Sequence, residues 1–178
     1  MRSDYIEQES FEHILSALMW ENRLALITSL TTGLRIDDVL HLRSEQIKTQ
    51  RFTIKEMKTG KTRKVRLSNG LWDELLKISG RYYVFEHRTD PKKPRTRQAV
   101  YKDLKRACTL FRVKGVNVSP HTARKIYAVK NFERTCSVDR VRTLLNHSEK
   151  QTEVTLLYAM ADDLTAKATK GKNVVLPQ

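Results

Sequence analysis

Apolar residues in the first part of the chain recur at the spacing of amphipathic helices. The first set is Phe11, Ile14, Leu15, Leu18 and Met19. This i, i+3, i+4, i+7, i+8 pattern predicts a helix with Ser10 as its N-cap. Residues 22–31 predict a second, buried helix that ends at Gly33, and a third begins at Ile36 with two aspartates in its first turn, where the helix dipole favours acids.

The pattern then changes to the period of a β-strand. Arg51–Ile54 and Lys64–Leu67 predict two strands, which flank the Gly-containing turn Lys58–Lys61. We therefore expect a β-hairpin with a basic tip. Helical spacing returns over residues 71–76, and we expect Gly80 to close that helix.

The rest of the chain again predicts helices. Tyr82–Phe85 predicts a short strand or a buried helix end, and residues 87–97 predict a basic loop. Two helices follow: one is marked by Val100, Tyr101, Leu104, Cys108 and Phe111, and one starts at Ser119-Pro120. The last two are a helix capped by Ser137, with Val138, Val141, Leu144 and Leu145 inside, and a short helix around Val154, Leu157 and Tyr158. The predicted fold class is mostly α with a small antiparallel sheet (α+β), without internal repeats.

Composition excludes several classes of protein. Of the 178 residues 39% are hydrophobic and only ten are Gly or Pro (six and four), which is untypical of disordered or fibrous chains. No apolar run is long enough to span a membrane, and the polar N-terminus is no signal peptide, so we expect a cytoplasmic protein. The two cysteines, Cys108 and Cys136, provide neither a metal cluster nor a disulfide framework.

The charge of the chain is large and unevenly distributed. The formal net charge is +14. Residues 1–50 hold 5 basic and 8 acidic side chains, a net of −3, whereas residues 51–178 hold 29 basic and 12 acidic ones, a net of +17. A charge of this size on one part of the chain favours a polyanion as partner, most often nucleic acid.

The candidate chemistry consists of cationic and aromatic groups at structural junctions. They are Arg35 at the turn into a helix, Lys58 at the hairpin tip, His121 and Arg124 at a helix start, His147 at a helix exit, and Tyr158. Each of them alone is commonplace on a protein surface. Motifs for Ser or Cys nucleophiles, metal ligands and Gly-rich phosphate loops are missing from the sequence.

These residues occur in segments that resemble the catalytic domain of the tyrosine recombinases, or phage integrases. The segments are Thr32–Leu40, Lys58–Arg63, Ser119–Arg124, Leu144–His147 and the terminal Tyr158. The resemblance as a whole extends over nearly the entire chain, from about Phe11 to Met160. The sequence departs from the family at Asn146, where Gly is usual, and in a longer interval between His147 and Tyr158. An N-terminal domain that clamps DNA is usual in the family and is missing here, so we expect a catalytic domain over residues 1–162 and a tail over residues 163–178.

The resemblance implies a role for each matched residue. Arg35 and Arg124 would bind the non-bridging oxygens of a DNA phosphate, with His121 and His147 completing the cradle and Asp38 orienting it. Lys58 would be the general acid and Tyr158 the nucleophile that forms a 3′-phosphotyrosyl link. Such residue types suit this chemistry, because fixed cations stabilise the charge that develops on phosphate oxygens and a phenolate. Neither a metal nor another cofactor is expected.

The implied function is site-specific DNA recombination, with double-stranded DNA as partner, an oligomer (a tetramer) on DNA, and accessory DNA-bending proteins as further possible partners. Candidate DNA-binding residues are Lys61, Arg63 and Lys64 on the hairpin and Lys92, Lys93, Arg95 and Arg97 in the loop. The tail 163–178 would dock on a neighbouring subunit. Two alternatives stay open: a DNA-binding module that performs no chemistry, and a topoisomerase-like enzyme that relaxes DNA by the same chemistry.

Overall fold

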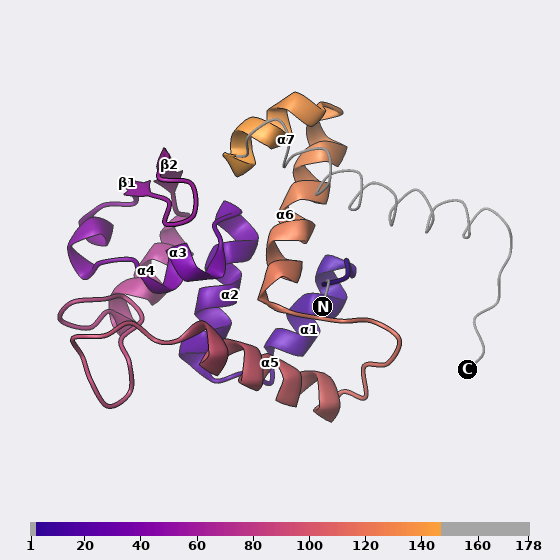
Figure 1. Cartoon of the computed structure of the whole chain (residues 1–178), viewed down its shortest axis with the longest axis horizontal. Helices are drawn as coiled ribbons and strands as arrows, with labels where there is room; N and C mark the ends of the chain where they lie inside the picture. The colour runs from indigo at the N-terminus through magenta and orange to yellow at the C-terminus, as the bar shows by residue number, and fades with distance from the viewer. Residues whose placement is uncertain (1–2, 147–178) are drawn as a thin grey trace, which may run out of the picture. The chain divides into compact units, whose positions relative to one another are not determined.

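A computed structural model describes residues 3–146 (Figure 1). The elements are α1 (Gln8–Leu15), α2 (Trp20–Thr32), α3 (Ile36–Leu40), the 3-10 helix η1 (Ser44–Lys48), β1 (Arg51–Lys55), β2 (Thr62–Arg66), α4 (Asn69–Ile78), α5 (Arg97–Leu110), α6 (Pro120–Thr135) and α7 (Val138–Leu145). The chain divides into two compact units, residues 1–127 and 128–178. The predicted class, mostly α with one small antiparallel sheet, is confirmed.

Helix α2 forms the centre of the first unit and contacts α3, α4 and α5. Its sequence is apolar on nearly all sides because neighbouring helices cover it, and Leu24, Ala25 and Leu26 are each at most 2% exposed. The helix ends as predicted at Gly33, which has the left-handed φ of 69°. This turn brings the chain directly into α3.

The hairpin also agrees with its prediction. Strands β1 and β2 pair antiparallel, with Phe52 opposite Val65 and Ile54 opposite Arg63. Ile54 and Val65 are buried, whereas the residues on either side of them in each strand are more exposed. This alternation is the period of two that a half-buried strand requires, so one face of the sheet joins the core and the other faces solvent.

The N-terminal boundaries differ from the prediction. Helix α1 has Glu7 as its N-cap, so Ser10 lies inside the helix. The helix ends before Leu18 and Met19; Leu18 is still buried, but Met19 is 47% exposed and caps α2. The apolar pattern continued past the end of α1 because the connecting turn keeps Leu18 on the side of the core.

Gly80 does not close α4 as predicted. The helix ends at Ile78, with Ser79 as its C-cap. A residue without a side chain is required at position 80, because a Cβ atom there would overlap the Glu86 side chain. The following segment Tyr82–Phe85 makes an isolated bridge instead of a strand, and its last residues are buried.

Helix α5 begins at the last residue of the predicted loop. Thr96 is its N-cap and its hydroxyl accepts a hydrogen bond from the backbone N–H of Ala99 (3.1 Å), so Arg97 is the first helical residue. Tyr101, which the pattern placed on the inner face, is 39% exposed, whereas Val100 and Leu104 are fully buried. The 3.6-residue period left Tyr101 at the edge of the apolar stripe.

Two later helix boundaries match the predictions. Ser119 precedes α6, and its hydroxyl accepts from the backbone N–H of His121 (3.2 Å). In the second unit, Ser137 caps α7 through the N–H of Arg140 (3.2 Å). Asn146 ends α7 with the left-handed φ of 55°, which explains how Asn can stand where Gly is usual, since Asn is the residue that most readily replaces Gly in this conformation.

We predict that Gly33→Ala destabilises the protein more than Gly115→Ala does. Both residues have positive φ, so each substitution costs about 1 kcal/mol of backbone strain. At Gly33 a Cβ atom would also overlap the Tyr127 ring, whereas nothing lies within 4 Å of a Cβ at Gly115. Thermal unfolding measures the difference, with Tm falling by about 2–4 °C per kcal/mol. Equal Tm values for the two variants would contradict the crowding at Tyr127.

Candidate active site

Two guanidinium groups meet at the C-terminal end of α2. Arg124, from α6, donates to the backbone carbonyl of Gly33. Arg63, from β2, donates to the carbonyl of Thr32 and, at 3.5 Å, to that of Gly33. Carbonyls at a helix end lack partners within the helix and carry the negative end of its dipole, so they attract cations. The helix end therefore fixes two arginines that lie 61 residues apart in sequence.

A buried carboxylate connects this cluster to the next arginine. The Glu56 side chain is 0% exposed, and its Oε2 accepts from Nη1 of Arg35 at 2.7 Å. Its Oε1 lies 3.7 Å from Nη1 of Arg63. Both arginine side chains are only 12% exposed. We call Arg35, Arg63 and Arg124 together with Glu56 the arginine cluster.

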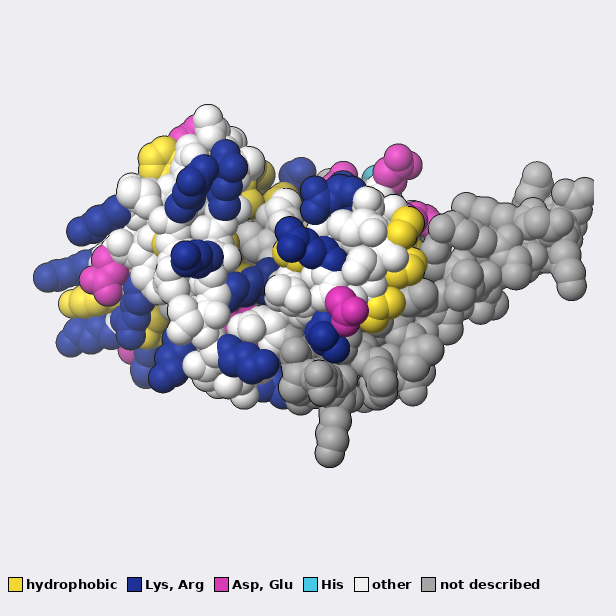
Figure 2. Space-filling model, turned by 90° about the horizontal axis from the view of Figure 1, so that it is seen from above, with side chains coloured by type: hydrophobic (Ala, Val, Ile, Leu, Met, Phe, Trp, Pro, Cys, Tyr) yellow, Lys and Arg dark blue, Asp and Glu magenta, His cyan; other side chains and the backbone are white. Residues whose placement is uncertain are grey.

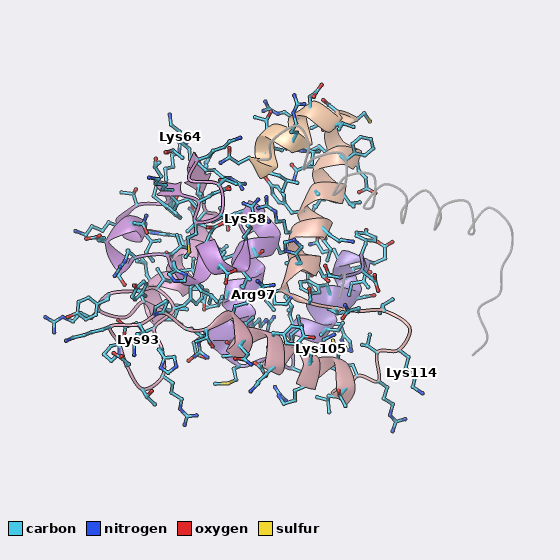
Figure 3. The ribbon with its side chains drawn as sticks, in the orientation of Figure 1. Lys58, Lys64, Lys93, Arg97, Lys105 and Lys114 are labelled. Carbon is cyan, nitrogen blue, oxygen red and sulfur yellow. The ribbon has the colours of Figure 1, made fainter. Side chains whose placement is uncertain are left out.

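The turn that carries Lys58 is attached to the same cluster by the residues on both sides of it. The Thr59 hydroxyl donates to Oε2 of Glu56 (3.0 Å), and the backbone N–H of Met57 donates to Oδ1 of Asp38 (2.8 Å). The N–H of Gly60 closes the turn on the carbonyl of Glu56 (2.8 Å). Lys58 itself is exposed, and Figure 3 shows it at the turn of the hairpin. The turn thus fixes the backbone of Lys58 while leaving its side chain accessible.

Asp38 lies at the edge of the cluster, where its side chain is 5% exposed. Desolvation raises its pKa, although the hydrogen bond from Met57 and the charge of Arg35 act in the opposite direction. Its predicted task was to orient the phosphate cradle. The structure gives Asp38 a contact with the Lys58 turn, and its role in orienting the cradle stays a prediction.

Cationic charge exceeds anionic charge in this region. Arg124 is 3% exposed, and burial lowers its pKa to about 9, with the charges of Arg35 and Arg63 acting in the same direction. It stays protonated at neutral pH. Because three guanidinium groups face Glu56 and an Asp38 whose carboxylate form is disfavoured, the cluster favours the arrival of an anion.

His121 lies one turn before Arg124 on α6 and keeps contact with solvent. The protein around its ring lowers the pKa to about 4, first by desolvation and then by the charges of Arg124, Arg97, Arg35 and Lys125. The imidazole is therefore neutral at pH 7 and can donate one hydrogen bond to an incoming oxygen.

The other predicted site residues differ in whether the structure describes them and in how exposed they are. His147 and Tyr158 lie outside the described residues. Lys61, Lys64, Lys92, Lys93 and Arg97 are exposed. Arg63 and Arg95 are instead largely buried: Arg63 belongs to the arginine cluster, and Arg95 donates to Asn22 (3.2 Å) and lies 3.6 Å from Glu21. Figure 3 shows Lys64 on the hairpin and Lys93 in the loop before α5, on separate parts of the first unit.

Glu56 was missed by sequence reasoning. A signal was present, because Glu56 is the only acidic residue between Arg51 and Arg66, a stretch that holds seven Lys and Arg residues. A lone acid in such surroundings is a candidate for ion pairing. Its burial, however, depends on contacts with residues 20 or more positions earlier, which no local pattern reveals.

Within residues 3–146, no group of three His, Cys, Asp or Glu side chains is arranged to hold a metal ion. In the same part of the chain, no helix is both long enough and apolar enough to cross a membrane.

Comparison with known proteins identifies the family. Residues 4–163 match the Phage integrase family. The chain belongs to the phage integrase family. This family match covers most of the chain and confirms both the resemblance predicted from sequence and the assignment to the recombinase class of enzymes.

Individual members of the family are distant from this chain. It is 25% identical over 168 residues to the probable integrase/recombinase YoeC of Bacillus subtilis (strain 168), covering 90% of each chain. It is 26% identical over 155 residues to the integrase of Escherichia phage P2, covering 87% of this chain but 42% of that integrase. The chain thus spans nearly all of one relative and less than half of the other.

Solved structures share the fold. The catalytic domain of bacteriophage HP1 integrase superposes with a TM-score of 0.65 at 19% identity, covering 89% of this chain and 88% of that domain. The XerH recombinase bound to its difH substrate gives 0.68 at 20% identity, covering 85% and 50%. A lambda integrase (75–356) dimer bound to a core site gives 0.70 at 19% identity, covering 87% and 59%. The fold is therefore that of integrase catalytic domains.

We predict that Glu56→Gln lowers the free energy of unfolding by about 3 kcal/mol, because breaking a buried ion pair leaves the remaining charges unpaired. Glu45→Gln is the matched control: Glu45 is exposed, and its substitution should change stability by less than about 0.5 kcal/mol. Urea denaturation measures both variants. If Glu56→Gln is as stable as the unaltered chain, Glu56 does not neutralise the arginines.

We also predict that the His121 ring titrates near pH 4 in the free protein. Because the folded protein then binds this proton less readily than the unfolded chain, the contribution of His121 makes the free energy of unfolding fall as the pH drops from about 6.5 towards 4. An anion in the arginine cluster should raise the pKa. NMR titration with and without DNA measures it, and His121→Gln assigns the signal. A ring that titrates at or above pH 6.5 without DNA contradicts the prediction.

Proposed function

We propose that this chain breaks and rejoins DNA strands, as a site-specific recombinase, through a covalent phosphotyrosyl intermediate. The observation that carries the proposal is the arginine cluster beside the Lys58 turn. It combines an excess of buried positive charge with an accessible lysine. Membership of the phage integrase family supports the same conclusion, and so do the relatives that are described as integrases.

The proposed reaction begins when a DNA phosphate reaches the cluster. Arg35 and Arg124 bind its non-bridging oxygens, and the planar guanidinium suits this task because it offers paired donors and keeps its charge. As the oxygens gain charge during displacement, fixed cations stabilise them without rearranging. The neutral His121 donates a further hydrogen bond, and His147 is assigned the same task from its sequence motif.

The covalent step conserves atoms and charge. The Tyr158 oxygen gives its proton to solvent water and attacks phosphorus, a new bond joins the tyrosine to the 3′-phosphate, and the bond from phosphorus to the 5′-oxygen breaks. Lys58 gives that 5′-oxygen its proton. A 5′-hydroxyl attacks the phosphotyrosine in the reverse step, which rejoins the strand and frees the tyrosine.

Double-stranded DNA is the proposed substrate, and the working assembly is an oligomer on DNA, a tetramer, to which residues 163–178 contribute contacts between copies. The excess of positive charge after residue 50 supports a DNA partner. The structural relatives bound to DNA support the same partner, and the lambda integrase relative is a dimer on its core site.

We predict that two substitutions separate the nucleophile from the acid. Tyr158→Phe should abolish the covalent protein–DNA adduct, because it removes the attacking oxygen, and should leave DNA affinity nearly unchanged. Lys58→Ala should slow cleavage by about 10²–10⁴-fold, the range for a positioned proton donor. Trapping on a nicked suicide substrate, followed by denaturing electrophoresis, measures the adduct.

A substrate with sulfur in place of the bridging 5′-oxygen provides the control, because its leaving group needs little protonation. It should restore cleavage by Lys58→Ala but not by Tyr158→Phe. If it restores neither, Lys58 is not the acid and Lys61 is the next candidate. An adduct that still forms with Tyr158→Phe refutes the assigned nucleophile.

A further inference from the structure

The solvent-facing side of the β-hairpin is rich in cations, which make up four of its six residues. Strand residues alternate between the two sides of the sheet, and the exposed set is Arg51, Thr53 and Lys55 from β1 with Thr62, Lys64 and Arg66 from β2. We call these six residues the outer face of the hairpin. Among the described residues, none of its four cations forms an ion pair or a side-chain hydrogen bond.

The register of the strands increases the repulsion on this face. Arg51 lies directly opposite Arg66, and Lys55 and Lys64 stand opposite threonines, so no acid lies opposite any of them. Like charges in directly opposed positions destabilise a sheet. Such an arrangement is unfavourable in the free protein and becomes favourable when a polyanion lies across it.

The outer face is separate from the arginine cluster. Arg63 points to the other side of β2, where it reaches the carbonyls of Thr32 and Gly33. A phosphate held by the cluster therefore contacts the inner side of the sheet and its turn. In Figure 3, Lys64 points away from the turn that carries Lys58. In Figure 2, dark-blue side chains predominate over magenta ones on the part of the molecule that includes the hairpin.

The dimensions of the outer face suit a nucleic-acid backbone. Arg51 and Lys55 are four residue steps apart, which corresponds to about 14 Å along a strand. Duplex DNA carries one phosphate charge for about every 1.7 Å of its helix axis, counting both strands, so a face of this length meets several of them. A shallow hollow of about 240 Å³ crosses the face between the strands. Four long side chains can thus each reach a phosphate.

We propose that the outer face of the hairpin binds the phosphate backbone of duplex DNA, at a place distinct from the phosphate that the arginine cluster holds. The partner rests on the proposed function, whereas the surface itself rests on the register and exposure of the strands. Three of its four cations, Arg51, Lys55 and Arg66, were not among the DNA-binding residues predicted from sequence. The face supplies affinity without sequence preference, because it offers contacts to phosphates alone.

The test compares two triple variants of the full chain that lose the same charge. Arg51→Gln, Lys55→Gln and Arg66→Gln change the outer face. Lys102→Gln, Arg112→Gln and Lys114→Gln change exposed cations of α5 and the loop after it, and Figure 3 shows Lys114 far from Lys64. Fluorescence anisotropy measures the Kd for a duplex of several helical turns over a range of salt concentrations.

The outer-face variant should bind more weakly, and its log–log salt slope should fall by up to about 2.7, which is 0.9 for each lost phosphate contact. The ratio of the Kd of the outer-face variant to the Kd of the unaltered chain should then fall about 40-fold as salt rises from about 50 to about 200 mM. The log–log salt slope of the control variant should stay within about 0.9, the value of one phosphate contact, of the slope of the unaltered chain. The Tm of the outer-face variant should be unchanged or higher, because the Arg51–Arg66 repulsion is removed.

Equal slopes for the two triple variants overturn the proposal, since DNA would then respond only to net charge. Loss of binding to anionic lipid vesicles with unchanged binding to DNA also overturns it and assigns the face to a membrane surface. Adduct formation by the unaltered chain on a nicked duplex tests the proposed function separately. If the unaltered chain forms no adduct but the outer-face variant loses affinity, the proposed function fails and the surface stands.

Discussion

The site depends on one buried carboxylate. Glu56 places a single negative charge between Arg35 and Arg63, and its backbone begins the turn that carries Lys58. Without it, three guanidinium groups would share a nearly dry region with only Asp38 to offset them, and their mutual repulsion would oppose folding. With it, the cluster retains excess positive charge, which is the condition for holding a phosphate.

The carbonyls at the end of α2 are the second constraint. Gly33 turns the chain with a left-handed φ, and the carbonyls of Thr32 and Gly33 then accept from Arg63 and Arg124. One helix end therefore aligns a strand residue with a helix residue from a distant part of the chain. Hydrogen bonds to fixed backbone atoms allow the guanidinium groups less movement than contacts between two flexible side chains would.

The arginine cluster and the outer face of the hairpin are two cationic sites that differ in how deeply their side chains are buried. In the arginine cluster, low exposure strengthens each interaction and lowers the pKa of Arg124, and the charges of the cluster help to lower the pKa of the neighbouring His121. A bound anion is therefore recognised by geometry and local charge. On the outer face of the hairpin, exposure keeps the side chains solvated and mobile, so an anion is attracted by charge density and the attraction weakens with salt. The first suits chemistry at one phosphate, and the second suits retention of a long polymer.

The sequence determined the elements and the motif residues. The helix caps at Ser119 and Ser137, the turn at Gly33 and the hairpin follow from local rules, and they agree with the structure because each depends on neighbouring residues only. Tertiary structure alone decided that Glu56 is buried and that Arg63 and Arg95 are largely withdrawn from solvent. The contacts of Glu56 with Arg35, of Arg63 with Thr32 and of Arg95 with Glu21 join residues 21 to 74 positions apart in sequence. Periodicity and charge do not specify such long-range contacts, because these depend on how α2, α3 and the hairpin pack together.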